Sequence, residues 1–329
     1  MTDDTQRELV EIRTFASMEE VHKLNGFREN NGVTKENYRR LFGDYWFADE
    51  VRCCFQKPNG VLCGEDHKAG FVVELIDGSY TILGNVCARD KFGADHKIKA
   101  DRSRYLREKA RRDKFAQLGE LLTERESRLS TLASLRERLK EASRRIEAFL
   151  ATLGDRTVRR LRDMARSGNP NVSVEAIIFR KGKDDQGNEY TERRATPTTL
   201  GSLNGLSVLN EYSLNAVYSG MTKIAQAYQR AREVTEDVKT SELENLTAVL
   251  ADFGRVVREA ENLEQEEAAF FQNDMSLLCF LVDDKAERYK AARVALGEAG
   301  SKEKAKSWLT EREQEIKRVL SADKISIPF

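Results

Sequence analysis

Apolar side chains recur every three or four residues through most of the chain beyond residue 99, which is the period of an amphipathic helix. Proline interrupts neither of two long stretches, 99–168 and 200–326, so nothing in them forbids a continuous helix. The most regular run is a heptad seam, and it predicts a long coiled-coil arm. It consists of Leu132, Leu135, Leu139, Ala142, Ile146, Phe149 and Leu153. Arg125 interrupts an earlier run of the same spacing, which consists of Phe115, Leu118, Leu122, Leu129 and Leu132. A three-residue slip where this run joins the seam is predicted to overwind the coil locally.

A second seam lies further along the chain. It consists of Leu246, Val249, Phe253, Val256, Ala260, Leu263 and Phe270. Because a predicted hairpin separates the two seams, we expect them to pair as antiparallel arms. Shorter helices are expected around 278–294 and 301–319. Seams of this regularity often pair between chains, so we also expect self-association, as a homodimer.

Two other regions alternate apolar and polar residues, which is the period of a strand. Phe71–Leu75 and Tyr80–Leu83 flank Asp77-Gly78, a sequence typical of a tight hairpin turn. Val172–Phe179 and Tyr190–Ala195 alternate around a polar turn in the same way and predict a second hairpin.

The first 48 residues are expected to form short helices. Thr34 is placed to cap one that carries Tyr38, Leu41 and Phe42.

Composition supports a helical protein with a solvated surface. Charged residues make up 33% of the chain, compared with roughly 25% in typical globular domains. Lys+Arg and Asp+Glu are equal at 55 each, which is typical of long helices with mixed charge on their outer faces. The start of the chain lacks a secretory signal, and no apolar run approaches the roughly 20 residues that span a bilayer. We therefore expect a cytoplasmic protein.

Four of the five cysteines fall between residues 53 and 87. In a reducing compartment such a cluster favours metal binding over disulfides. If residues 57–60 form a four-residue hairpin loop, Cys54 lies opposite Cys63, and directly opposed residues project from the same face. This register favours Cys54 as a ligand over Cys53, which would point away.

The predicted metal ligands are Cys54 (with Cys53 as the alternative), Cys63, His67 and Cys87, with His96 as another choice for the fourth position. Four nitrogen and sulfur ligands leave no open position on a tetrahedral Zn²⁺ ion, so the predicted zinc is structural and not catalytic. Two hairpins followed by a short helix that bears the last ligand resemble a treble-clef zinc finger over about 40 residues. The spacings here are longer, and the second member of the last ligand pair is missing.

Charge is unevenly distributed although the net charge is zero. Residues 89–114 contain eleven Lys or Arg and five acids, whereas residues 228–274 contain twelve acids and five bases. A cationic helix that emerges from a zinc module could neutralise phosphates. The predicted nucleic-acid-binding residues are Lys97, Lys99, Arg102, Arg104, Arg107, Arg111 and Arg112. Alternatively, the basic and acidic helices satisfy each other in a protein-binding scaffold.

Catalytic motifs are scarce. The chain contains no GxxxxGK[ST] phosphate loop, no GxGxxG and no HExxH. The carboxylates on or near the second hairpin are Glu175, Asp184, Asp185, Glu189 and Glu192. They could hold Mg²⁺ for phosphodiester cleavage, which makes a nuclease the third hypothesis.

Together these patterns predict a mainly α protein with long antiparallel coiled-coil helices, a small zinc-binding β-hairpin module and a second β-hairpin. The expected divisions are 1–48 (short N-terminal helices), 49–98 (zinc module), 99–168 (basic helix and coiled-coil arm), 169–199 (hairpin) and 200–329 (helical return arm and C-terminal helices). The function predicted is that of a non-catalytic adaptor that docks on nucleic acid, with DNA favoured, or on a protein partner within a larger assembly, and not on a membrane.

Overall fold

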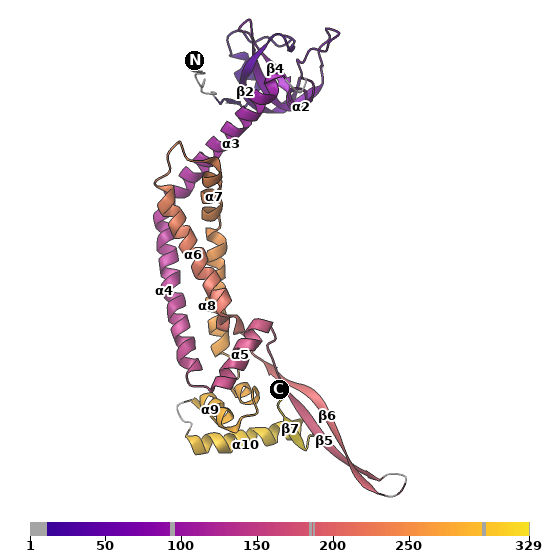
Figure 1. The fold of residues 1–329 in the computed structure, drawn as a ribbon, viewed down its shortest axis with the longest axis vertical. Coiled ribbons are helices and arrows are strands. Elements are labelled where there is room, and N and C mark those ends of the chain that lie inside the picture. The colour runs from indigo at the N-terminus through magenta and orange to yellow at the C-terminus, as the bar shows by residue number, and fades with distance from the viewer. Residues whose placement is uncertain (1–11, 93–95, 184–185, 187, 298–300, 329) are drawn as a thin grey trace, which may run out of the picture. The chain divides into compact units, whose positions relative to one another are not determined.

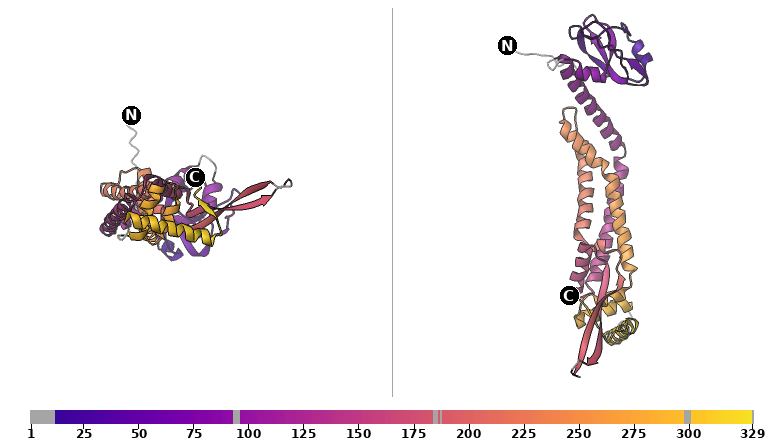
Figure 2. Two further views of the ribbon diagram at one scale, coloured as in Figure 1. Left: turned by 90° about the horizontal axis from the view of Figure 1, so that it is seen from below. Right: turned by 90° about the vertical axis from the view of Figure 1, so that its right-hand side faces the viewer.

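The computed structural model describes residues 12–92, 96–183, 186, 188–297 and 301–328. The chain divides into two compact units. The first comprises Met1–Glu120 and Val238–Glu244, and the second comprises Leu121–Asp237 and Asn245–Phe329. Figures 1 and 2 show the elements of each unit.

The first unit is built on a four-stranded sheet of order β1-β2-β3-β4. Strand β1 runs parallel to β2, and the other neighbouring pairs are antiparallel. The strands are β1 (Thr14–Phe15), β2 (Tyr38–Arg52), β3 (Asp66–Leu75) and β4 (Tyr80–Gly84), and the helices are α1 (Met18–His22), α2 (Asn85–Asp90) and the first part of α3 (Lys97–Thr123).

Both faces of this sheet are buried. Val73 and Leu83 belong to one hydrophobic cluster, which also contains Ile98 and Tyr105 of α3. Val72 and Ile82, their chain neighbours, belong to a second cluster on the other face. Because successive strand residues point to opposite faces, the run of consecutive apolar residues in β3 supplies both clusters.

The helix expected around Tyr38, Leu41 and Phe42 is wrong, because these residues lie in β2. Leu41 and Phe42 are buried in different clusters, which the two-residue period of a strand allows and one helical stripe would not. The segment is rich in aromatic side chains, which favour strands. The first predicted hairpin is confirmed: Phe71 pairs with Leu83, and Gly78 adopts a φ of 79° in the turn.

The second unit contains a bundle of three helices, α4 (Arg125–Leu150), α6 (Glu211–Ala231) and α8 (Phe253–Phe271), which lie side by side in both side views (Figures 1 and 2). The interruption of the first run at Arg125 coincides with a break, since α3 ends at Thr123 and α4 begins at Arg125. A shorter helix, α7 (Thr240–Ala251), precedes α8.

The two predicted seams do not form antiparallel arms. Arg138 forms an ion pair with Glu264 at 2.9 Å and Arg145 one with Glu267 at 2.7 Å, so residue numbers rise together and α4 runs parallel to α8. The antiparallel partner is α6, where the guanidinium of Arg136 lies over the ring of Tyr218. Helix α6 carries the chain back between the two seams, so the second seam must run in the same direction as the first.

The first seam is nevertheless a buried stripe. Its residues Leu132, Leu135, Leu139, Ala142 and Ile146 are all buried, and they are covered from within the same chain. The described part of the chain shows no long two-stranded coiled coil, because the third helix completes a bundle.

The second predicted hairpin is confirmed and forms an extended ribbon (Figures 1 and 2). The sheet has the order β6-β5-β7, so β6 is an edge strand, and its Pro197 pairs with Glu175 of β5. The ribbon consists of β5 (Asn171–Lys183) and β6 (Glu189–Ser202). The remaining elements of this unit pack around its base: α5 (Asp155–Ser167), η1 (Leu206–Leu209), η2 (Met275–Phe280), α9 (Lys285–Leu296), α10 (Lys302–Val319) and β7 (Lys324–Ser326).

Among the residues that the structure describes, no helix is both apolar and long enough to cross a bilayer.

Candidate metal centre

Three cysteines of the first unit form a cluster that could hold a metal ion such as zinc. The sulfur atoms of Cys53, Cys63 and Cys87 all lie within 4.8 Å of one another, and those of Cys63 and Cys87 are 3.7 Å apart. Tetrahedral zinc with sulfur ligands at about 2.3 Å separates two sulfurs by about 3.8 Å. The spacing therefore fits thiolates around one ion, whereas a disulfide needs about 2.05 Å.

Three separate segments bring these thiols together. Cys53 follows the end of β2, Cys63 lies on the hairpin that precedes β3, and Cys87 lies in α2 directly after β4. The amide N–H of Gly84 donates to the sulfur of Cys53 at 3.4 Å. The cluster thus joins the ends of the sheet to the start of the following helix.

The hairpin register explains why Cys53, and not the preferred Cys54, is in the cluster. Gln56 bridges to Leu62, and the Cys63 amide donates to the Phe55 carbonyl at 2.6 Å. The loop is therefore one residue longer than predicted, and the pairing is shifted by one position. A shift of one residue moves each side chain to the opposite face.

Cys54 consequently lies on the far side of the sheet. It belongs to the second hydrophobic cluster, and its thiol donates to the Glu29 carbonyl at 2.8 Å. This thiol is a buried hydrogen-bond donor outside the metal cluster.

His67 lies beside the cluster but is not part of it. Its Nε2 is 2.6 Å from the hydroxyl of Tyr45, and its Nδ1 is 3.2 Å from the carbonyl of Glu65. The imidazole packs against Gly84, where an added Cβ would lie 3.3 Å from the ring. Gly84 thus lies against both the His67 ring and the Cys53 sulfur.

Burial controls the electrostatics of the cluster. Desolvation raises the pKa of Cys53 and of Cys87 above the usual value for a thiol, and it lowers the pKa of His67. In the absence of a cation, both thiols are therefore held in the protonated form. A bound zinc ion reverses this preference, because coordination deprotonates a thiol.

The other histidines and the remaining cysteine lie elsewhere. His96, the alternative ligand, packs against Phe92 with the ring centroids 5.0 Å apart and has its Nε2 3.0 Å from the carbonyl of Lys35. Cys279 is fully buried in the core of the second unit, and burial raises the pKa of its thiol to about 12. It behaves as a small apolar side chain.

The basic residues of α3 start from the same core as the metal cluster. Ile98 and Tyr105 are buried together with Cys53 and Cys87. The Tyr105 hydroxyl donates to the carbonyl of Arg13 at 2.7 Å. This packing fixes the first two turns of α3 to the sheet.

Of the predicted nucleic-acid-binding residues, Lys97, Arg104, Arg107 and Arg112 are exposed, and Lys99, Arg102 and Arg111 are half-buried. Arg104, Arg107 and Arg111 are spaced by three and four, so they share one face of the helix. Arg102 instead donates to Asn85 at 3.0 Å, and Lys97 donates to the carbonyl of Arg39 at 3.1 Å.

One exposed aromatic residue of the first unit is not among the predicted functional residues. Trp46 is 75% exposed, although aromatic side chains of this size are mostly buried. The sequence shows a tryptophan within an aromatic run, but the exposure of its side chain depends on the strand register.

Two of the ribbon carboxylates pair with arginines. Glu175 lies 3.7 Å from Arg193, and Glu192 lies 2.9 Å from Arg194. Asp184 and Asp185 lie outside the described residues. Glu189 is exposed.

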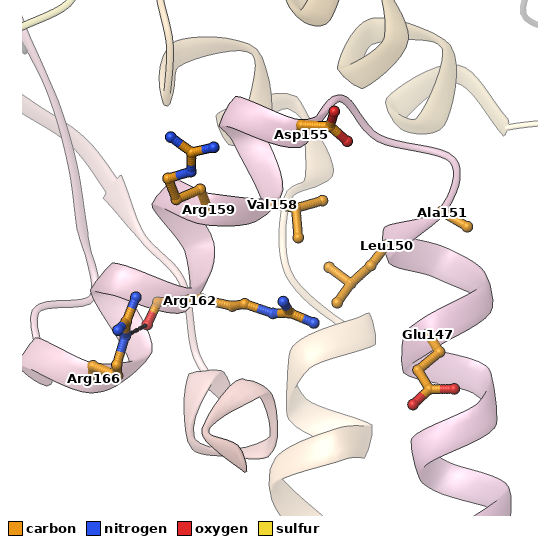
Figure 3. A pocket seen from close by; sticks show the side chains of 8 residues that line it. All are labelled: Glu147, Leu150, Ala151, Asp155, Val158, Arg159, Arg162 and Arg166. Atoms are coloured by element: carbon orange, nitrogen blue, oxygen red, sulfur yellow. Dashed lines mark hydrogen bonds between the residues drawn. The ribbon is translucent and has the colours of Figure 1, made fainter. Parts of the chain in front are cut away.

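A groove of about 520 Å³ in the second unit is lined by α4 and α5. Figure 3 shows Leu150 and Val158 facing each other across it, with Arg162 extending toward the side of Glu147. Arg162 also lies 3.6 Å from Glu211. Because a carboxylate already pairs with an arginine that lines the groove, we assign no function to this groove.

Comparisons with protein-family models, with curated proteins and with solved structures found no match to this chain.

Proposed function

We propose that this protein is a non-catalytic adaptor whose first unit is a zinc-stabilised module that binds nucleic acid through α3. In this proposal the helical second unit holds the module within a larger assembly. DNA is the favoured ligand, and the zinc ion is structural.

One observation carries the proposal. Cys53 and Cys87 share a buried cluster with Ile98 and Tyr105 of α3, so an ion held by the cysteines would stabilise the base of the cationic helix. A helix fixed in this way loses less backbone entropy when its cations bind phosphates.

The acidic segment offers little support for the scaffold alternative. Its Glu264 and Glu267 are paired with Arg138 and Arg145 of α4, which belong to the second unit. Both glutamates therefore already have cationic partners outside the basic run of residues 89–114. The favoured phosphate-binding surface is therefore the face of α3 that carries the exposed Arg104 and Arg107 and the half-buried Arg111.

Binding should depend steeply on salt, because phosphate contacts release counterions. We expect affinity for labelled DNA, measured by fluorescence anisotropy, to fall at least about tenfold between about 50 and 200 mM salt. Replacing Arg104, Arg107 and Arg111 together by glutamate should abolish binding at both salt concentrations.

A matched control makes the same change in charge elsewhere. Arg156, Arg159 and Arg160 are exposed on α5 in the second unit, and their replacement by glutamate should leave DNA affinity unchanged. If the unmodified protein binds neither duplex nor single-stranded DNA at about 50 mM salt, the proposed function is wrong and the protein-binding scaffold takes its place.

We also propose that His67 supplies the fourth zinc ligand by exchanging its hydrogen bond to Tyr45 for the ion. Its position beside Gly84 and its neutral imidazole, favoured by burial through a lowered pKa, support this assignment. A neutral imidazole is the form that binds zinc.

Zinc affinity, measured by competition with a chromophoric chelator, tests this ligand. His67→Ala should weaken binding by more than about 100-fold, beyond the 10–100-fold typical of residues that only orient a ligand. Tyr45→Phe removes the competing hydroxyl and should not weaken it. Equal affinity of His67→Ala and the unmodified protein would exclude His67 as a ligand.

A further inference from the structure

The three cysteines of the metal cluster differ in their access to solvent. Cys53 and Cys87 are each 2% exposed, whereas Cys63 is half-buried. The residue that follows it, Gly64, is exposed and turns the chain with a φ of 64°. Because reactive cysteines are partially exposed and buried ones are inert, a small oxidant dissolved in water would reach Cys63 first.

Cys63 also has a second sulfur in direct contact. The sulfur of Cys87 lies 3.7 Å away, from a residue 24 positions later in the chain. A disulfide needs a separation of about 2.05 Å, so the two sulfurs would have to approach by about 1.7 Å. Rotation of the two side chains can supply a movement of this size. The pair is therefore close enough to form a bond without a change of fold.

Cys53, the third member of the cluster, is held more firmly. Its sulfur accepts the amide N–H of Gly84 at 3.4 Å. Its own amide donates to the carbonyl of Glu65 at 3.0 Å, and its carbonyl accepts from the amide of Gly64 at 3.1 Å. Buried and bonded on both sides, Cys53 is the thiol expected to stay reduced.

We infer that a peroxide oxidises Cys63 and Cys87 to a disulfide, so that the metal centre is a redox-sensitive switch of the first unit. This inference rests on the zinc centre of the proposed function, since coordination keeps the sulfurs as thiolates. The thiolate is the form of cysteine that reacts.

The oxidation takes place in two steps. The Cys63 thiolate attacks one oxygen of hydrogen peroxide, so that an S–O bond forms, the O–O bond breaks and hydroxide leaves. The Cys87 thiolate then attacks the sulfur of the resulting sulfenic acid, so that the S–S bond forms, the S–O bond breaks and a second hydroxide leaves. The peroxide gains the two electrons that the two sulfurs lose.

The disulfide removes two of the ligands on which the metal centre depends. Cys53 and His67 would remain, and two ligands do not satisfy a tetrahedral zinc ion. The new bond still joins the hairpin to α2, but the end of β2 at Cys53 loses its connection to both. Because α2 shares a core with Ile98 and Tyr105, the base of α3 should become less stable.

Peroxide treatment of the zinc-loaded, unmodified protein tests the switch. A chromophoric indicator measures released zinc, and alkylation followed by peptide mass spectrometry maps the thiols. We expect loss of one zinc per chain, a disulfide between Cys63 and Cys87, and a Cys53 that is still alkylated. The thermal midpoint of the first unit should fall, and dithiothreitol with added zinc should restore it.

Cys54→Ala is the matched control, because Cys54 is as deeply buried as Cys53 but lies in the other hydrophobic cluster. It should release zinc at the same rate and form the same disulfide. Slower release would show that Cys54 takes part in the reaction and would overturn the assignment to Cys63 and Cys87.

The outcomes separate this inference from the proposed function. Zinc that stays bound in peroxide, or a disulfide that includes Cys53, overturns the switch. Neither result affects the DNA affinity of the reduced, zinc-loaded protein, which decides the proposed function in a separate titration. Release of zinc together with the Cys63–Cys87 disulfide supports the switch whether or not that protein binds DNA.

Discussion

Cys87→Ser is expected to lose the metal ion and to leave the first unit unfolded while the second unit stays folded. Cys87 is buried in the core that joins α2 to β3 and α3, so its loss removes both a ligand and a packing contact. Structural zinc contributes on the order of 10–16 kcal/mol to the folding of small zinc domains. This contribution is of the same size as the whole stability of a typical domain, about 5–15 kcal/mol.

Calorimetry and metal analysis check this expectation together. The unmodified protein should contain one zinc per chain and show two thermal transitions, and the variant should lose the zinc and the transition of the first unit. A strong chelator should have the same effect on the unmodified protein.

Cys54→Ala is the matched control, because Cys54 is equally buried, at 2% exposed, but belongs to the other hydrophobic cluster. It should keep its zinc. Purified protein that contains no metal, or that melts unchanged in chelator, would contradict the metal centre.

Gly205→Ala is expected to destabilise the second unit by more than about 4 kcal/mol, a loss that single substitutions rarely reach. Gly205 adopts a φ of 72°, and an added Cβ would overlap the carbonyl oxygen of Glu266 and the amide nitrogen of Phe270. Both atoms belong to the backbone of α8, so no side-chain rotation can relieve the overlap. The thermal midpoint of this unit should fall by on the order of 10 °C.

Gly168→Ala separates the two causes. Gly168 adopts nearly the same φ, 67°, but an added Cβ there meets nothing within 4 Å. It should cost only the 1–2 kcal/mol of a left-handed backbone conformation. Equal losses in the two variants would show that the close approach to α8 contributes nothing.

The cysteine cluster was predicted from the sequence, but one of its members was not. Cysteine spacing was enough to predict a cluster in the first unit, and Cys63 and Cys87 are in it. The choice between Cys53 and Cys54 depended on whether the intervening loop has four residues or five. Nothing in Lys57-Pro58-Asn59-Gly60 decides that length, and each choice places a different thiol on the metal-binding face.

The long helices were predicted from their periodicity, but their directions were not. Heptad spacing shows that α4 and α8 each bury one stripe, and the burial of Leu135 and Val256 agrees. Periodicity contains no information about the order of helices in space. The intervening α6, with buried Met221 and Ile224, reverses the chain once more and makes α4 and α8 parallel.

Short amphipathic segments were the least predictable. Tyr38, Leu41 and Phe42 satisfy a helical stripe as well as a strand, and only pairing with β3, which lies more than twenty residues later, decides between them. Long-range pairing of this kind is invisible to a local pattern.

Pro197 disfavours the pairing of another strand with the outer edge of the ribbon in the second unit. Proline within a sheet is tolerated where its nitrogen faces solvent, so the donor that is missing at this position falls on the outer margin of β6. If a second chain added a strand beside β6, one of its carbonyls would have no amide donor opposite it at Pro197. The ribbon is therefore protected at this position against edge-to-edge pairing with another chain.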